Sequence, residues 1–298
     1  MARHSSKIPP SPIVSPASDG RAGPGVLGWK EHPGGFLDTD SDRFKRAVLS
    51  LPDVRLRIDW LDQHVQSQPA EWVAALLDVV VGESEISEPK AREVLVTIAL
   101  WVAGNARDAD LDRLRQAALE QRLLSLQRVI RRVPAPSQAP EPTAPPVPDY
   151  GAGRELTLGE RRNLARRSDR QRFDQLLRDP HPMVVTELLA NPKTTEDDVV
   201  RLAAHRPARP TSIEAIARTR WLTRPRVRMS VLLNPGSPPG VALPLVGLCT
   251  RTELLELARS ADTPVILRIT AQELAERRPP LFGEHGEPPS EPDRRLLQ

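Results

Sequence analysis

The chain has 298 residues, enough for two domains of ordinary size, and its formal net charge is only +3. Aromatic residues make up 3% of it, so its cores must be built from Leu, Val, Ile and Ala, which favours an all-α fold and argues against a β-sandwich. The single cysteine, Cys249, excludes an internal disulfide and lies in an apolar run, which indicates a small buried hydrophobe.

Both ends of the chain have the composition of disordered segments. Residues 1–37 are rich in Pro, Gly and Ser and show no hydrophobic period, and residues 280–298 are similar. The N-terminus lacks the apolar core of a secretory signal, and no apolar run approaches the length of a membrane-spanning helix. We therefore expect no membrane insertion and a cytoplasmic location.

Residues 38–133 have the periodicity of a helical bundle. Ser41 is predicted to cap the first helix, because apolar residues follow at helical spacing from Phe44 onward. Ser87-Glu88-Pro89 is expected to open the most hydrophobic helix, which ends at Gly104. In the last helical segment the apolar phase slips near Glu120, which predicts either a kink or a pair of helices.

Residues 134–153 form a proline-rich linker that contains PAPSQAPEPTAPPVP. Such a segment favours polyproline II, so we expect a semi-rigid spacer between two domains. A ligand for an SH3-like module is the alternative interpretation.

Residues 154–279 contain an internal repeat. The segment HPMVVTELLANPKTTEDDVVRLAAHRP, which starts at His181, recurs from Arg224 as RPRVRMSVLLNPGSPPGVALPLVGLCT, and the two Asn-Pro pairs lie 43 residues apart. A period in the forties with two helices in each unit is typical of helical solenoids. A capping box at Thr157 and Glu160 is predicted to begin the first helix of this region.

These repeats carry a resemblance to a known class. Segments such as LLRDPHPMVVTELLANPKTTEDDVVRLAA resemble the leucine-rich repeat variant and HEAT-like repeats of uncharacterised bacterial proteins, in which short helices alternate around Asn-Pro or His-Pro turns. The resemblance covers roughly residues 157–278 and implies a curved α-solenoid that serves as a scaffold or binding surface, without catalytic residues. The sequence departs from the pattern where Pro238, Pro239, Gly240 and Pro244 crowd one helix of the second copy, which puts the fit of that helix in doubt.

Arginine side chains gather in the repeat region and form the candidate binding surface. Its members are Arg218, Arg220, Trp221, Arg224, Arg226, Arg228, Arg162 and Arg166. If they all face the concave side of a solenoid, they form a track for a nucleic-acid backbone, without sequence specificity. The alternative is that exposed helix faces need charge and that arginine is the commonest cation of this chain.

Enzymatic signals are weak in this sequence. It has no phosphate-binding glycine loop, and His181 and His205 stand beside prolines, where a histidine is more often a turn or cap residue than a base. Glu196, Asp197 and Asp198 open a helix and complement its dipole, so a metal site is not expected there. A HEAT-like DNA glycosylase is the one enzymatic alternative, and it would need aromatic and acidic residues along the basic groove.

We therefore predict an all-α protein, an N-terminal helical bundle followed by a HEAT-like α-solenoid, that acts as a non-enzymatic scaffold or adaptor and binds a protein partner through its repeat surface. The alternative is sequence-nonspecific binding of a nucleic-acid backbone by the arginine-rich face. We expect no catalytic residue, cofactor, metal or small-molecule ligand. The bundle is an interaction module or a cap on the end of the solenoid, and its slightly acidic balance would let it dock on the basic repeats.

Overall fold

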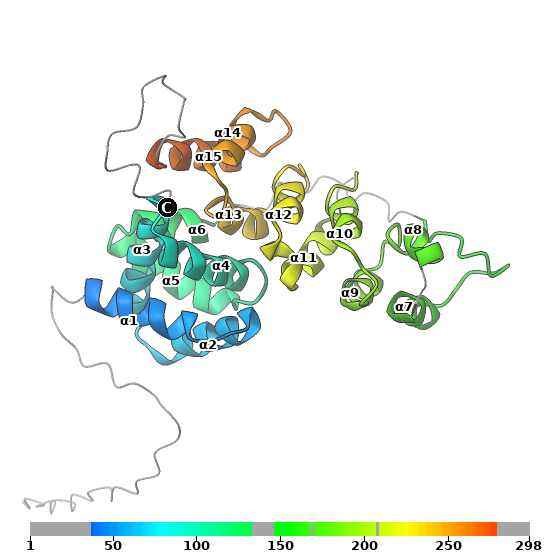
Figure 1. Cartoon of the computed structure of the whole chain (residues 1–298), viewed down its shortest axis with the longest axis horizontal. Helices are drawn as coiled ribbons and strands as arrows, with labels where there is room; N and C mark the ends of the chain where they lie inside the picture. The colour runs from blue at the N-terminus through cyan, green and yellow to red at the C-terminus, as the bar shows by residue number, and fades with distance from the viewer. Residues whose placement is uncertain (1–36, 133–145, 168–169, 207–208, 279–298) are drawn as a thin grey trace, which may run out of the picture. The chain divides into compact units, whose positions relative to one another are not determined.

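Helices account for all the regular structure in the computed structural model, which describes residues 37–132, 146–167, 170–206 and 209–278 (Figure 1). Across these ranges there are fifteen α-helices, two 3-10 helices and no strand, so the all-α prediction is confirmed. The segments predicted to be disordered, residues 1–37 and 280–298, lie outside these ranges except for Leu37. No helix in the described part of the chain combines the length and the apolar character needed to cross a bilayer.

Six helices form the N-terminal bundle. They are α1 (Leu37–Leu49), α2 (Val54–Ser67), α3 (Ala70–Glu85), α4 (Pro89–Gly104), α5 (Asp108–Glu120) and α6 (Leu124–Ile130). α3 lies at the centre, because it packs against α1, α4, α5 and α6. The predicted start and end of α4 are confirmed, and this helix carries Trp101, the largest side chain that is fully buried.

Two details of the bundle correct or refine the sequence predictions. Ser41 is not an N-cap: it lies inside α1, is fully buried, and donates a hydrogen bond to Glu83 of α3 over 3.4 Å. The prediction was wrong because the helix already begins at Leu37. The phase slip near Glu120 corresponds to two helices, since α5 ends there and Arg122 adopts a positive φ of 56° before α6 begins.

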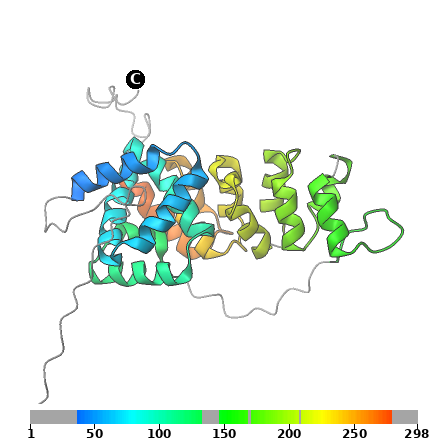
Figure 2. The same ribbon diagram turned by 90° about the horizontal axis from the view of Figure 1, so that it is seen from below.

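Nine further α-helices form the repeat region. They are α7 (Leu158–Arg167), α8 (Phe173–Leu176), α9 (Pro182–Ala190), α10 (Glu196–Ala203), α11 (Pro210–Ala217), α12 (Pro225–Leu232), α13 (Pro239–Val246), α14 (Arg251–Arg259) and α15 (Val265–Arg277), with the 3-10 helices η1 (Arg170–Arg172) and η2 (Arg220–Thr223). Each helix packs on a near neighbour in sequence: α7 on α9, α9 on α11, and α10 on α12. Figure 2 shows these helices side by side.

The two sequence repeats match each other helix for helix. α9 corresponds to α12, and α10 to α13, at the same 43-residue offset that the Asn-Pro pairs show. The side-chain amide of Asn191 donates to the carbonyl oxygen of Ala165 in α7 over 2.8 Å. That of Asn234 donates to the carbonyl of Ala203 in α10 over 2.6 Å. Both asparagines are buried and satisfy carbonyls near helix ends, so each one joins its own repeat to the preceding helices.

The turn after each asparagine is also the same in both copies. The Asn191 side-chain oxygen accepts from the amide of Lys193 over 2.9 Å, and the Asn234 oxygen accepts from that of Gly236 over 3.1 Å. Three residues after each asparagine, the hydroxyl of Thr194 or Ser237 donates to a carbonyl of the preceding helix over 2.5 Å. A hydroxyl residue can therefore close this turn whether it is Thr or Ser.

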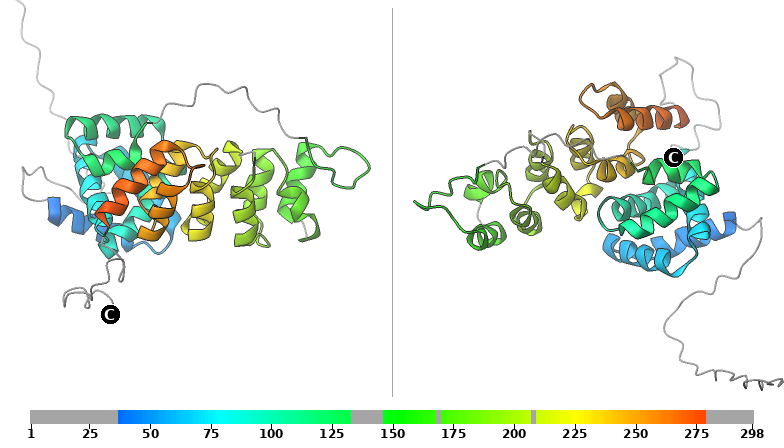
Figure 3. Two further views of the ribbon diagram at one scale, coloured as in Figure 1. Left: turned by 90° about the horizontal axis from the view of Figure 1, so that it is seen from above. Right: turned by 180° about the vertical axis from the view of Figure 1, so that it is seen from behind.

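α13 differs from its counterpart α10 in being buried all round. Every residue from Val241 to Cys249 is buried, because α4 and α6 of the bundle cover the face that α10 leaves open (Figure 3). The crowding prolines do not prevent this helix: Pro239 occupies the first turn, where no amide hydrogen is needed, and Pro244 is accommodated within it. The predicted burial of Cys249 is confirmed, and burial raises the pKa of its thiol to about 12.

Arginine side chains fasten the bundle to the repeat region at the end of α13. Arg92 donates to the carbonyl of Leu248 over 3.3 Å, while the buried Arg278 donates to the carbonyl of Gly247 over 2.7 Å and to that of Ser84 over 3.0 Å. Arginines suit this place because the last carbonyls of a helix lack intrahelical partners. The bundle therefore packs on the repeats through a buried contact.

A buried carboxylate adds a second link between the bundle and α15. Glu85 of α3 is 2% exposed and accepts two hydrogen bonds from Arg128, of 2.8 and 2.6 Å. Arg277 of α15 approaches the same carboxylate to 2.8 Å. A buried charge needs such pairing, so these two arginines make the burial of Glu85 tolerable.

The last residues of the predicted linker pack on the start of the repeat region. Residues 134–145 lie outside the described residues, but Tyr150 is buried and its hydroxyl donates to Asp179 over 2.6 Å. Asp179 is fully buried and also accepts from Arg161 at 2.7 and 2.9 Å. The predicted capping box at Thr157 and Glu160, which directly precedes Arg161 in the chain, is confirmed.

Candidate functional site

Two of the predicted binding residues, Arg162 and Arg166, are engaged within the repeat region. Both lie on α7 and donate hydrogen bonds to Glu187 of α9, over 2.8 and 2.7 Å. Hydrogen bonds from Arg166 and then Arg162 hold the pKa of Glu187 at about 2, well below its usual range. These two arginines therefore share one counter-charge, which offsets one of their two positive charges.

Three members of the predicted surface also have structural roles. Arg226 forms an exposed ion pair of 2.7 Å with Asp197, the second residue of α10. Arg228 is only 8% exposed and lies beside the buried thiol of Cys249. The ring of Trp221 is half-buried, and its indole N–H donates to the carbonyl of Leu189 over 3.2 Å. Each of these three side chains is therefore already paired, buried or hydrogen-bonded within the protein.

Arg218, Arg220 and Arg224 are the exposed remainder of the predicted surface. Among the described residues, none of the three has a carboxylate within 4.0 Å. Arg220 lies over the ring of Trp221, with its guanidinium carbon 5.7 Å from the ring centre. The structure therefore divides the eight predicted residues, and it does not join them into one continuous track of unpaired cations.

Arg218 and Arg220 border a cleft between the bundle and the repeat region. The cleft has a volume of about 330 Å³. α2 and the end of α4 form one wall, and the end of α11 with the start of η2 forms the other. Buried apolar side chains form its floor: Ile58, Leu100 and Ala217. A neighbouring cleft of about 410 Å³ shares Arg218 with it.

α4 and α11 approach each other closely beside this cleft, at Gly104. A Cβ atom at Gly104 would lie 3.0 Å from the carbonyl carbon and oxygen of Ala217. A larger residue would therefore require the α11 backbone to shift by a few tenths of an ångström. The sequence interpretation of Gly104 as a helix-terminating residue is therefore incomplete, because its main role is to admit the α11 backbone.

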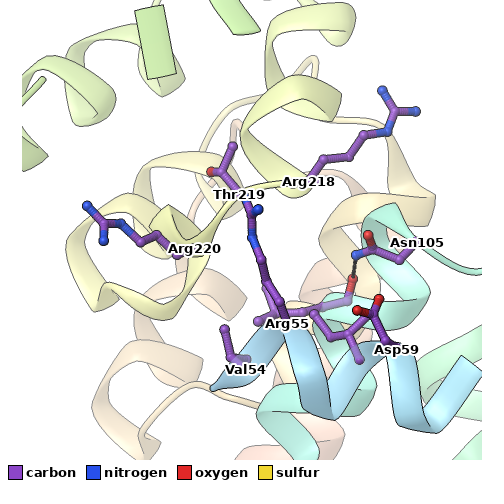
Figure 4. A pocket seen from close by; sticks show the side chains of 10 residues that line it. Val54, Arg55, Asp59, Asn105, Arg218, Thr219 and Arg220 are labelled. Atoms are coloured by element: carbon purple, nitrogen blue, oxygen red, sulfur yellow. Dashed lines mark hydrogen bonds between the residues drawn. The ribbon is translucent and has the colours of Figure 1, made fainter. Parts of the chain in front are cut away.

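The charged side chains around the cleft are mainly cationic. Arg55 extends from α2 toward Thr219, and the guanidinium groups of Arg218 and Arg220 point outward on either side of it (Figure 4). Among the described residues of the lining, Asp59 is the single acidic one. Asn105 also faces the cleft, and its amide donates to the carbonyl of Leu100 over 2.9 Å. The site thus combines three positive charges, one negative charge and an apolar floor.

Comparison with known proteins does not place the chain in a family. No protein-family model, curated protein or solved structure matches the chain. The resemblance to HEAT-like repeats therefore stays a prediction.

Two polar residues that were considered as metal ligands or bases, Asp198 and His181, make hydrogen bonds or ion pairs within the repeat region. Asp198 completes a capping box with Thr195 and pairs with Arg170, while His181 caps α9 by accepting from the Met183 amide over 3.2 Å. The interpretation of His181 as a cap is confirmed. In the parts of the chain that the structure covers, no three His, Cys, Asp or Glu side chains are placed to hold a metal ion.

Arg55 and Asn105 are site residues that the sequence analysis missed. Arg55 belongs to the first turn of α2, and Asn105 follows the last turn of α4, so both lie in the bundle rather than in the repeats. No local pattern marks them, because their proximity to Arg218 arises only when the bundle packs on α11.

Proposed function

We propose that this protein is a non-enzymatic scaffold or adaptor that binds a protein partner, and that the cleft bordered by Arg55, Arg218 and Arg220 is the contact site. The observation that carries the proposal is the composition of the cleft, which sets exposed arginines around a buried apolar floor. Protein interfaces combine an apolar centre with a polar rim, and arginine is enriched in them. The cytoplasmic location expected from the sequence is part of this proposal.

We also propose that α7 to α13 belong to a HEAT-like α-solenoid. The support is the matching of α9–α10 with α12–α13, together with the similar hydrogen bonds that Asn191 and Asn234 make to carbonyls of preceding helices. Stacked units of this kind present an extended surface whose shape is set by the packing between repeats. Such an architecture suits binding more directly than catalysis.

Binding of a nucleic-acid backbone is the alternative function, and Arg218, Arg220 and Arg224 are the residues that favour it. A backbone-binding track needs a row of cations that can release counterions from successive phosphates. In the repeat region, Glu187 and Asp197 interrupt such a row, because Glu187 offsets one of the two charges of Arg162 and Arg166 and Asp197 offsets that of Arg226. The protein-binding proposal therefore fits the geometry better.

A displayed library of random peptides, selected on the full chain, tests the proposed function. We expect enrichment of a peptide family that loses binding when Asp59→Trp fills the cleft, since Asp59 is exposed and lines it. The matched control is Glu256→Trp, an exposed acidic residue of α14 outside the cleft, which should keep binding. Failure to enrich any peptide, or equal binding by both variants, would contradict the proposal.

A further inference from the structure

We propose that the ligand of the cleft is an extended acidic peptide segment, whose carboxylates contact Arg55, Arg218 and Arg220. This inference rests on the proposed function and specifies the class of partner. The cleft residues of the bundle and of the repeats take part together, so the site exists only in the chain as a whole.

An arginine is available to an acidic ligand when no neighbouring carboxylate already pairs with it. Within the described ranges, no carboxylate lies within 4.0 Å of the three cleft arginines, although Asp59 lines the same cleft. Their charges are therefore available to a ligand, and complementary charge across an interface favours an acidic one.

The three guanidinium groups of the cleft point in different directions. Arg55 points across the cleft toward Thr219, whereas Arg218 and Arg220 point outward to opposite sides (Figure 4). Cations that converge on one point would suit a single compact anion such as phosphate. Divergent cations suit a ligand that carries several separate negative charges along an extended chain.

The lining of the cleft favours a peptide over a nucleic acid. Proteins that hold single-stranded nucleic acid stack its bases on aromatic side chains, and none of the described residues that line the cleft is aromatic. Asp59 would repel a continuous phosphate backbone, which has no neutral positions. A peptide can instead place apolar side chains on Ile58 and Leu100 and acidic ones at the arginines.

Fluorescence anisotropy with the full chain tests this inference. The probe is a short labelled peptide in which Glu and Leu alternate, and the comparison probes are the same peptide with Gln in place of Glu and a labelled single-stranded oligonucleotide. We expect the acidic peptide to bind and the Gln peptide to bind at least about tenfold more weakly, with affinity falling as salt rises.

Variants locate the binding. Arg55→Gln and Arg218→Gln should each weaken binding of the acidic peptide by about two- to fivefold, as expected for the loss of one exposed charge pair. The matched control is Arg259→Gln, an exposed arginine of α14 outside the cleft, which should leave affinity unchanged. Far-UV circular dichroism checks that each variant is folded.

The outcomes distinguish the inference from the proposed function. Absence of binding to the acidic peptide, or equal binding of the Gln peptide, overturns the inference. If library peptides still bind at the cleft in that case, the proposed function stands. Tighter binding of the oligonucleotide, dependent on the same arginines, overturns both and favours the nucleic-acid alternative.

Discussion

The asparagine that joins each repeat to the preceding helices offers the sharpest test of the fold. In Asn234→Ala the substitution removes a side chain that is 2% exposed and makes three hydrogen bonds. These run to the carbonyl of Ala203 over 2.6 Å, to that of His205 over 3.3 Å, and from the amide of Gly236 over 3.1 Å. All three backbone groups would lose this partner in the variant.

The expected loss of stability follows from these contacts. Each hydrogen bond contributes about 1 kcal/mol net, and a buried polar group left unsatisfied costs about 1–3 kcal/mol, so we expect a decrease of roughly 2–4 kcal/mol in the free energy of unfolding. For a folded part of this size, a loss of about 3 kcal/mol lowers the melting temperature by roughly 6–12 °C. Asn191→Ala should behave similarly, because Asn191 makes the equivalent bonds to Ala165 and Lys193.

Urea unfolding followed by far-UV circular dichroism measures the effect. The matched control is Asn163→Ala on α7, where the asparagine is exposed and alanine is a good helix former, so the change should stay within about 0.5 kcal/mol of zero or be stabilising. If Asn234→Ala lies within about 0.5 kcal/mol of that control, the amide-to-carbonyl bonds do not hold the repeats together and the reasoning is wrong.

Three further predictions concern the bundle and its contact with the repeats. Burial lowers the pKa of His64 from 6.5 to about 4, so between these pH values the unfolded chain binds a proton that the folded chain does not. The free energy of unfolding should therefore fall as pH decreases from about 6.5 to about 4, by up to about 3 kcal/mol more in the natural chain than in His64→Phe. Parallel urea titrations of the two proteins would show this difference. Glu85→Gln removes the charge of a buried partner of two arginines and should lower the free energy of unfolding in urea by about 3 kcal/mol. The exposed control Glu256→Gln should lower it by less than about 0.5 kcal/mol, and equal losses would show that the pairing is unimportant. Gly104→Ala should destabilise the protein by about 1–3 kcal/mol, because its Cβ would meet the Ala217 backbone at 3.0 Å. Gly159→Ala meets nothing within 4 Å and should stabilise the protein by about 0.5–1 kcal/mol. Thermal unfolding measures both changes, and the same sign for both would refute the close approach.

Much of the helical architecture could be predicted from the sequence, because its signals are local. The apolar spacing in α4, the break after Glu120 and the Asn-Pro repeat depend on residues a few positions apart, and the structure confirms each of them. One available signal was underused: the run from Val241 to Cys249 is apolar on every side, which is typical of a helix buried all round. It could have predicted that another element covers α13.

The candidate site depends on tertiary structure. Sequence spacing grouped Arg162, Arg166 and Arg226 with Arg218, but the fold brings a carboxylate to each of the first three and none of the described ones to Arg218. Whether an arginine is paired depends on which neighbouring helix supplies an acid, and that neighbour lies tens of residues away in the chain.

By itself, the sequence determined that this protein is helical and that a helix pair recurs after 43 residues, because hydrophobic period and turn chemistry act within a few residues. Only the tertiary structure decided that Gly104 admits the α11 backbone and that Arg55 of the bundle shares a cleft with Arg218. The physical reason is that packing between distant helices selects which side chains are buried, paired or left to face a ligand.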